Sequence, residues 1–178
     1  IGPRTPVEVH EVSPGDEIAL PTPSGAYVAR VIGARHEGCT PDAVAAEAVI
    51  YDITAPAGGR ILYATDTGLI DDVTPMRDAA YDVILIEETF GDHVDHGTGH
   101  LDLATLPVML ERLGEVGART ASTQVVAVHL GHHNPPEALL RDRLASMGVR
   151  LVDDGTVVGA PRRELILGGA RSGKSREA

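Results

Sequence analysis

The sequence predicts an α/β protein, and three of its features carry this prediction. Short extended stretches separated by turn residues open the chain, and apolar runs of strand length follow them. Two segments with helical signals then alternate with strand-like runs, which is typical of α/β folds. Polar residues gather just beyond the predicted strands, where open α/β sheets carry their sites. The 178 residues suffice for one domain with a sizeable core.

The first extended stretches are residues 6–10, 17–20 and 26–34. Between them lie Ser-Pro-Gly-Asp at 13–16 and Pro-Thr-Pro-Ser-Gly at 21–25. Because proline fixes φ and glycine permits positive φ, both clusters are typical of turns.

Two further strands are predicted at residues 48–53 and 60–65, and Ala-Pro-Ala-Gly-Gly at 55–59 suits a hairpin loop between them. Residues 83–86, Val-Ile-Leu-Ile, form a continuous apolar run that is typical of a strand buried on both faces. Residues 125–128 predict another buried strand, which ends just before His129.

A helix is expected over residues 105–115, because apolar side chains recur on one of its faces. These side chains are Leu106, Met109, Leu110 and Leu113. The next helix has start and stop signals: Asn134 suits the N-cap, Pro135 the first helical position and Gly148 the C-terminal cap. Glu137 would complete a capping box with Asn134.

Beyond this helix, residues 150–152 and 156–158 are expected to form a β-pair turned by Asp-Asp-Gly at 153–155. Pro-Arg-Arg at 161–163 then indicates a domain linker. The chain starts without methionine and stops three residues after a nucleotide-binding motif, so we expect a fragment of a longer protein.

Composition excludes several classes of function. A formal net charge of −11 argues against a polynucleotide partner, because phosphate backbones require clustered Lys and Arg. A small phosphate ester is not excluded as a ligand, because metal ions or helix N-termini can supply local positive charge. No apolar run approaches the roughly 20 residues of a membrane span, and no signal peptide opens the chain. A single cysteine, Cys39, excludes an internal disulfide and suits a reducing cytoplasm.

Asp66 is the first candidate for chemistry, because residues 61–68 place one carboxylate at the tip of an apolar strand, just before a small residue and a glycine. A carboxylate fixed at such a tip can bridge two metal ions. An aspartate that merely opens a turn is an equally weighted alternative, since Asp is a common turn former.

Histidines supply the other candidates. His129 closes a buried strand, from which an imidazole can be directed at a metal ion. A core histidine is the alternative, which the nearby His132 and His133 weaken, although those two could equally be solvated. His36 follows an extended stretch, and His100 precedes a helix as either a helix-start residue or a proton donor.

Four short motifs, taken in order, resemble the later motifs of the metallo-β-lactamase superfamily. They are His36, Ala-Thr-Asp-Thr-Gly at 64–68, His-Leu-Asp at 100–102 and Val-His-Leu-Gly-His at 128–132. They look most similar to the branch with tRNA-maturation nucleases and the cyclic-phosphate phosphodiesterase of phosphonate breakdown. The resemblance covers about residues 6–159 and implies the C-terminal half of an αββα sandwich.

The resemblance also implies a two-metal site. His36, Asp66 and His129 would be metal ligands, with Asp66 bridging two divalent ions, either zinc or manganese. His100 would act on the substrate phosphate, by protonating the leaving oxygen or stabilising the charge of the transition state. The implied reaction is metal-assisted hydrolysis of a phosphodiester.

One departure from the family is serious. Its His-x-His-x-Asp-His motif, which supplies most of the metal ligands, is absent and is expected upstream of the first residue. Residues 92–96 contain His-x-Asp-His, but Gly91 replaces the first histidine and the segment follows the bridging aspartate. We therefore interpret His93 and His96 as loop residues. Three ligands, one of them shared, would leave two ions under-coordinated, so this chain alone is not expected to bind both tightly.

The C-terminal residues match the phosphate-loop pattern G-x-x-x-x-G-K-[ST], with a predicted strand at 164–167 before it. In such a loop the backbone N–H groups cradle phosphates, Lys174 would reach the terminal ones, and Ser175 would bind the Mg²⁺ of ATP or GTP. A flexible glycine-rich tail is the alternative. The predicted nucleotide-binding residues are Gly168, Gly169, Ala170, Arg171, Ser172, Gly173, Lys174 and Ser175.

Residues 165–175 closely resemble the opening of adenosylcobinamide kinase/adenosylcobinamide-phosphate guanylyltransferase, an enzyme of cobalamin synthesis. Some members of that family look like fusions with an N-terminal metallo-β-lactamase-like domain. The resemblance implies that residues 1–160 are the C-terminal part of such a domain. Residues 161–178 would then be the linker and the truncated start of a P-loop kinase domain.

The leading hypothesis is a phosphodiester-type hydrolase joined to a corrinoid kinase and guanylyltransferase. The alternative is a non-catalytic module that scaffolds the kinase or binds its substrate. A third interpretation, an RNA-processing nuclease, is disfavoured by the net charge. The expected partners are a small phosphorylated substrate and a nucleotide, with neither membrane nor nucleic acid. Since half a sandwich would expose an apolar sheet face, we also expect the isolated chain to be either unstable or self-associated as a dimer or other homo-oligomer.

Overall fold

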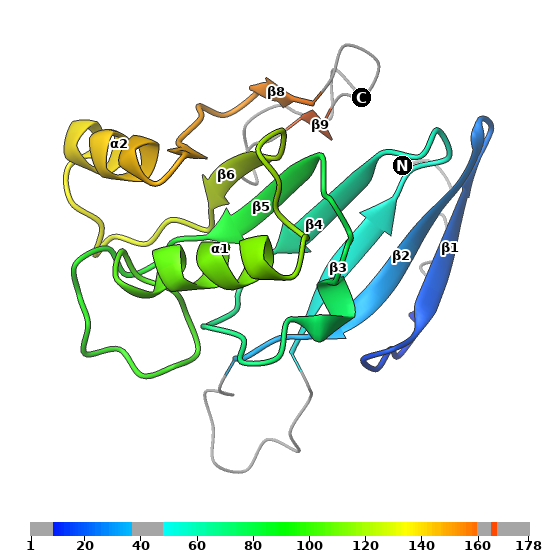
Figure 1. Ribbon diagram of the computed structural model, residues 1–178, viewed down its shortest axis with the longest axis horizontal. Coiled ribbons are helices and arrows are strands. Elements are labelled where there is room, and N and C mark those ends of the chain that lie inside the picture. The colour runs from blue at the N-terminus through cyan, green and yellow to red at the C-terminus, as the bar shows by residue number, and fades with distance from the viewer. Residues whose placement is uncertain (1–8, 37–47, 160–164, 167–178) are drawn as a thin grey trace, which may run out of the picture.

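The computed structural model describes residues 9–36, 48–159 and 165–166, and its main element is a seven-stranded sheet (Figure 1). The strands lie in the sheet in chain order: β1 (Glu17–Thr22), β2 (Gly25–Gly33), β3 (Val49–Thr54), β4 (Arg60–Ala64), β5 (Val83–Glu87), β6 (Gln124–Val128) and β7 (Val149–Arg150). Strands β1 to β4 pair antiparallel, and β4 to β7 pair parallel. Because β2 and β4 both run antiparallel to β3, β2 has the same direction as β4, β5 and β6.

Both α-helices pack on one face of this sheet. Helix α1 (Thr105–Glu115) follows β5 and lies across the sheet in Figure 1, and α2 (Glu137–Ser146) follows β6. A short 3-10 helix, η1 (Thr74–Met76), lies between β4 and β5. The apolar faces of α1 and α2 form one core with sheet residues such as Leu62, Ile84 and Val125.

The opposite face of the sheet is covered more thinly. There, β5 and β6 contribute Val83, Leu85 and Val126 to a smaller cluster, which Val158 of β8 (Val157–Val158) joins. Tyr63, which pairs in register with Leu85 and so lies on this face, is 42% exposed. Within the described residues, the sheet thus has helices on one face, as predicted for half of an αββα sandwich.

Several predicted elements are confirmed closely. Helix α1 has the predicted bounds, and its four predicted core residues are buried. Strands β3 and β4 form the expected hairpin, closed by the hydrogen bond from Ala55 N to Gly59 O at 2.7 Å. All five residues of β5 are buried, as expected for a parallel strand in the middle of a sheet. Gly148 has φ +72° just beyond α2, as its predicted capping role requires.

The predicted start of the second helix is wrong, because α2 begins at Glu137 and leaves Asn134 and Pro135 outside it. Glu137 pairs with Arg141 at 2.7 Å instead of completing a capping box. The Asn134 amide group donates, at 3.1 to 3.4 Å, to three carbonyls near the ends of β5 and β6, those of Glu88, Thr89 and Gly131. Asn134 therefore binds two loops together rather than capping a helix.

The predicted β-pair of residues 150–152 with 156–158 is also wrong. Val149–Arg150 extends the main sheet beside β6, where a parallel neighbour satisfies its backbone groups. Val157–Val158 pairs antiparallel with β9 (Leu165–Ile166) in a separate two-stranded sheet. The predicted turn between them is present, with Gly155 at φ +83°.

Some predictions concern residues outside the described ranges. These include Cys39, the linker at 161–163 and the nucleotide-binding residues 168–175, so the structure does not test them. Among the helices of the described ranges, none combines the length and the apolar character needed to cross a membrane.

Candidate metal centre

The predicted site residues lie along one edge of the sheet. The carboxyl ends of β2, β4, β5 and β6 meet there, because these strands share one direction. His36 lies three residues beyond β2, Asp66 two residues beyond β4 and His129 directly beyond β6. Glu87 is the last residue of β5, and His100 lies in the loop between β5 and α1. The strand order therefore accounts for their convergence from distant parts of the sequence.

Three imidazoles surround one oxygen of Asp66. Its Oδ1 lies 3.1 Å from His36 Nε2, 3.5 Å from His100 Nδ1 and 3.6 Å from His129 Nε2. The side chain of Asp66 is 52% exposed, so the cluster opens to solvent. In the part of the chain that the structure describes, the ligand atoms of His36, Asp66 and His100 lie within 4.8 Å of one another. His129 reaches Asp66 but lies outside that tighter set.

The donor chemistry of this cluster fits a transition-metal ion. Imidazole nitrogen and carboxylate oxygen are ligands of zinc, and both also occur in manganese sites. Few protein donors and a solvent-open side are typical of catalytic metal sites, which keep positions for water or substrate. The cluster could therefore hold a divalent ion, and its side chains require no rearrangement of the sheet to do so.

Hydrogen bonds of the backbone hold the segment that carries His36 against the loop that carries Asp66. The Arg35 N–H donates to Thr67 Oγ1 at 3.0 Å, and the Gly68 N–H donates to Arg35 O at 2.6 Å. Thr67 is fully buried, so these contacts are shielded from water. They explain how His36, which follows an antiparallel strand, stays within reach of Asp66.

Two of the clustered residues have a left-handed backbone. Asp66 has φ +62° and His129 has φ +54°. This conformation costs an L-residue about 1–2 kcal/mol, although Asp and His tolerate it better than most residues. The surrounding contacts offset the cost, among them the hydrogen bond from Thr89 Oγ1 to His129 O at 3.0 Å. Strained residues of this kind cluster at functional sites.

Glu87 is a buried carboxylate behind the cluster, with an exposed fraction of zero. It accepts hydrogen bonds from Thr67 N–H, from Thr89 Oγ1 at 2.6 Å and from Leu101 N–H at 3.1 Å. His100 Nδ1 lies 3.2 and 3.3 Å from its two oxygens. Glu87 therefore fixes the orientation of the His100 ring and favours a proton on Nδ1.

Phe90, the only phenylalanine of the chain, joins the loops beside the cluster. Its ring lies 4.2 to 6.0 Å, centroid to centroid, from the rings of His93, His96, His100 and His133. All four of these contacts are stacked or tilted rather than edge-on. The loop after β5 and the loop after β6 are thus held together by ring packing as well as by Asn134.

Four further histidines lie in these loops, outside the candidate metal cluster: His93, His96, His132 and His133. His93 and His96 are loop residues as predicted, and His96 Nε2 pairs with Asp102 Oδ2 at 3.0 Å. His132 lies beside His133, with a ring separation of 4.1 Å. Desolvation, followed by the proximity of other imidazoles, lowers the pKa of His133. These surroundings therefore favour the neutral form of the His133 ring.

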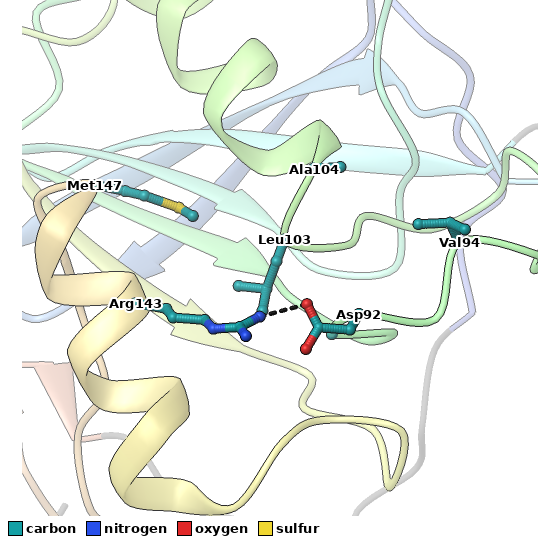
Figure 2. A pocket seen from close by; sticks show the side chains of 7 residues that line it. Asp92, Val94, Leu103, Ala104, Arg143 and Met147 are labelled. Carbon is teal, nitrogen blue, oxygen red and sulfur yellow. Dashed lines mark hydrogen bonds and ion pairs between the residues drawn. The ribbon is translucent and has the colours of Figure 1, made fainter.

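A pocket of about 210 Å³ is lined by residues of the loop between β5 and α1 together with Arg143 and Met147 at helix α2 (Figure 2). Leu103 and Met147 form much of its apolar wall, and Val94 lies at the loop side. Figure 2 shows Arg143 of α2 directed at Asp92, with which it forms an ion pair. This ion pair ties the start of the loop to α2.

Gly68 offers a test of the close packing under the site. A Cβ at this position would lie 1.8 Å from Thr98 O and 3.2 Å from Arg35 O. Gly68→Ala is therefore expected to lower the free energy of unfolding by about 2–3 kcal/mol or more, since backbone must move to admit the methyl group. Gly114→Ala is the matched control in α1, because a Cβ there meets nothing within 4 Å.

Thermal melts of the two variants measure this difference. The control should gain up to about 1 kcal/mol, the usual advantage of alanine over glycine in a helix. Equal stability of the two variants would show that the backbone around Gly68 can move to admit a methyl group at little cost in free energy.

Sequence reasoning missed Glu87, Glu88 and Phe90. A signal for the two glutamates was present, because they directly follow the fully apolar run at 83–86. Polar residues at the corresponding ends of β4 and β6 had been singled out for that same reason. Phe90 had no such signal, since an aromatic residue beyond a strand is usually a packing residue.

Comparisons with known proteins show the fold. No family model matches the sequence, and no curated protein matches it with significance. Among solved structures, the metallo-β-lactamase fold protein YhfI from Bacillus subtilis matches with a TM-score of 0.56 and 15% identity, over 82% of this chain and 52% of that one. Unliganded yeast PDE1 matches with a TM-score of 0.56 and 13% identity, over 79% of this chain and 46% of that one. The chain thus has a metallo-β-lactamase-like fold and spans about half the length of these structures.

Proposed function

We propose that the chain belongs to a metal-dependent hydrolase of phosphodiester type and supplies one half of its site. The observation that carries this proposal is the position of Asp66 Oδ1, within 3.6 Å of nitrogen atoms of three histidines at one sheet edge. A carboxylate and imidazoles on strand ends of this fold are the arrangement that the sequence resemblance implies. The remaining donors of a two-metal site would come from the other half of the sandwich.

His36, Asp66 and His129 would hold the metal ions, with Asp66 as the bridging ligand. Divalent zinc or manganese, when bound there, supplies an activated water molecule and neutralises charge on the attacked phosphate. The 52% exposure of Asp66 leaves its second oxygen accessible. His36 is less exposed and is held by the Arg35 and Thr67 contacts, so it would provide the more rigid ligand.

His100 would act on the substrate rather than on the metal. Its Nδ1 faces the buried Glu87 at 3.2 and 3.3 Å, so that Nε2 remains for an oxygen of the substrate phosphate. From that position the ring can donate a proton to the leaving oxygen. Glu87 would stabilise the positive charge that the ring carries before donation. The reaction class is general-acid-assisted hydrolysis of a phosphate ester.

A small phosphorylated molecule is the substrate class that the charge balance favours. The net charge of −11 disfavours a long phosphate backbone, whereas a single ester requires positive charge only at the metal ions and at His100. We also propose that the domain is joined to a corrinoid kinase and guanylyltransferase that uses ATP or GTP with Mg²⁺. The support is the sequence motif at 168–175, with Lys174 and Ser175 in the phosphate-binding positions.

Metal content and hydrolysis, measured on the same preparations, test the proposal. The full-length protein, with both halves of the sandwich present and purified with Zn²⁺ or Mn²⁺, is expected to retain metal in elemental analysis and to hydrolyse bis(4-nitrophenyl) phosphate. His129→Ala should lose both, and His132→Ala, three residues along the same loop, should keep both. His100→Ala should keep the metal and lose about 10²-fold or more in rate, because general acid catalysis contributes that much.

The outcomes separate the candidate functions. Loss of metal in His100→Ala would reassign His100 as a ligand, in line with its place beside His36 and Asp66. Metal without hydrolysis would favour the binding module that scaffolds or feeds the kinase. The absence of both bound metal and hydrolysis would refute the proposed site.

A further inference from the structure

Glu88 is a second buried glutamate, next to Glu87 but with different partners. Its side chain is fully buried, and its Oε1 accepts the Gly91 N–H at 2.9 Å. Within the described residues its Oε2 has no hydrogen-bond partner. A buried carboxylate oxygen without a donor is costly, so the state of this group requires an explanation.

Asn134, in the loop after β6, also has a buried oxygen without a hydrogen-bond donor among the described residues. This oxygen is its Oδ1. The orientation of the amide is determined, because its nitrogen donates to three carbonyls and a flipped amide would place oxygen against them. Gly91 adjoins both groups: its N–H binds Glu88, and a Cβ on it would lie 3.0 Å from Asn134 Oδ1.

Both residues adjoin Gly91, and a single proton between Glu88 Oε2 and Asn134 Oδ1 would satisfy both buried acceptors. We infer that Glu88 is a neutral carboxylic acid whose O–H donates to Asn134 Oδ1, and that this bond holds the loop of His100 to the loop of His129. Glu88 directly follows β5 and Asn134 lies near the α2 end of the second loop, so the bond joins the start of the first loop to the end of the second.

The electrostatic surroundings agree with this assignment. Desolvation raises the pKa of Glu88 to about 6, and the Gly91 N–H and the Asn134 amide only partly oppose the rise. The charged groups that bear on it, Glu87 and Asp102, are both acidic and raise the pKa further. Asp92, nearby on the loop, is paired with Arg143 (Figure 2).

Glu88 is therefore a positioning residue, and its role in activity rests on the proposed function. Loss of its proton would place an anion against Asn134 Oδ1 and near two other carboxyl groups. We expect the two loops to separate and the distance between His100 and His129 to increase. Proton release would thus loosen the site without any change in the ligands themselves.

The sign of the pH dependence follows from the raised pKa. The folded protein holds this proton up to about pH 6, whereas the unfolded chain releases it near the ordinary value of 4.5. The stabilising contribution is therefore complete below about pH 4.5 and is lost as the pH rises through 6. Glu88→Gln retains a donor for Asn134 and an acceptor for Gly91 at every pH.

The test compares thermal melts of the wild type and Glu88→Gln between pH 4.5 and 7.5, with the exposed Glu111→Gln as a control. The variant should match the wild type at pH 4.5 and exceed its Tm by about 5 °C at pH 7.5. The control should follow the wild type throughout. Side-chain carboxyl NMR of the wild type should also show one glutamate titrating near pH 6, and this signal should be absent in Glu88→Gln.

A Tm difference that is the same at all pH values would overturn the inference, as would a Glu88 carboxyl that titrates at its ordinary value. The NMR measurement decides the matter even if the variant does not fold. Neither experiment requires bound metal or substrate, so failure here is distinct from failure of the proposed hydrolase.

Discussion

In the full-length protein, Asp66→Asn is expected to reduce metal-dependent hydrolysis strongly while the protein stays folded. The carboxylate oxygen near three imidazoles becomes an amide, which is a much weaker ligand for divalent ions. Asparagine tolerates the left-handed backbone at this position, and the side chain is half exposed, so stability should change little. Metal affinity and the rate of phosphodiester hydrolysis should each fall about 100-fold or more.

The matched control for this change is Asp95→Asn, which removes the same charge from an exposed loop position. Metal content by elemental analysis and hydrolysis rates are measured on both variants and on the wild type. Full metal content and an unchanged rate in Asp66→Asn would remove the central ligand from the proposed site.

Glu87→Gln is expected to destabilise the protein and to slow hydrolysis. An amide has one acceptor oxygen, so at least one of the N–H groups of Thr67 and Leu101 would face a donor. The loss should be about 3 kcal/mol, since buried hydrogen bonds to a carboxylate are replaced by a donor–donor contact. The Tm should therefore fall by about 6–12 °C. Hydrolysis should fall about 10- to 100-fold, because His100 loses the partner that orients it.

Glu88→Gln provides a sharp contrast, because the same substitution is made one residue away at an equally buried position. At pH 7.5 it should stabilise the protein, whereas Glu87→Gln should destabilise it. Thermal melts at that pH and hydrolysis at saturating metal measure both effects. Equal responses of the two variants would mean that burial alone, and not the hydrogen-bond partners, governs these glutamates.

Local sequence patterns predicted the elements whose partners are close in the chain. Helix α1 was predicted to the residue, because its apolar spacing defines the buried face. The β3–β4 hairpin followed from a five-residue loop of proline, glycine and alanine. The prediction for Asn134 was wrong because it used local sequence alone. The position of Asn134 before Pro135 fits a helix start, but the carbonyls it binds belong to residues distant in the sequence.

The candidate site was predicted in part. His36, Asp66, His100 and His129 were singled out from their order and from their places beyond strands, and the structure brings all four together. Whether they bind metal remains a prediction. Glu87 and Glu88 were missed although their place directly after an apolar strand was a signal, because nothing local indicates that two adjacent glutamates are buried.

What the sequence determined by itself was the class of the fold, most of the strands and the identity of the groups available for chemistry. These depend on side-chain periodicity and on residue type, which are local properties. The tertiary structure decided which groups meet, because the shared direction of β2, β4, β5 and β6 places their ends on one edge. It also decided the different roles of Glu87 and Glu88. Glu87 ends β5 and Glu88 directly follows it, and the fold gives them different surroundings: Glu87 meets three donors and an imidazole, whereas one oxygen of Glu88 has no partner among the described residues.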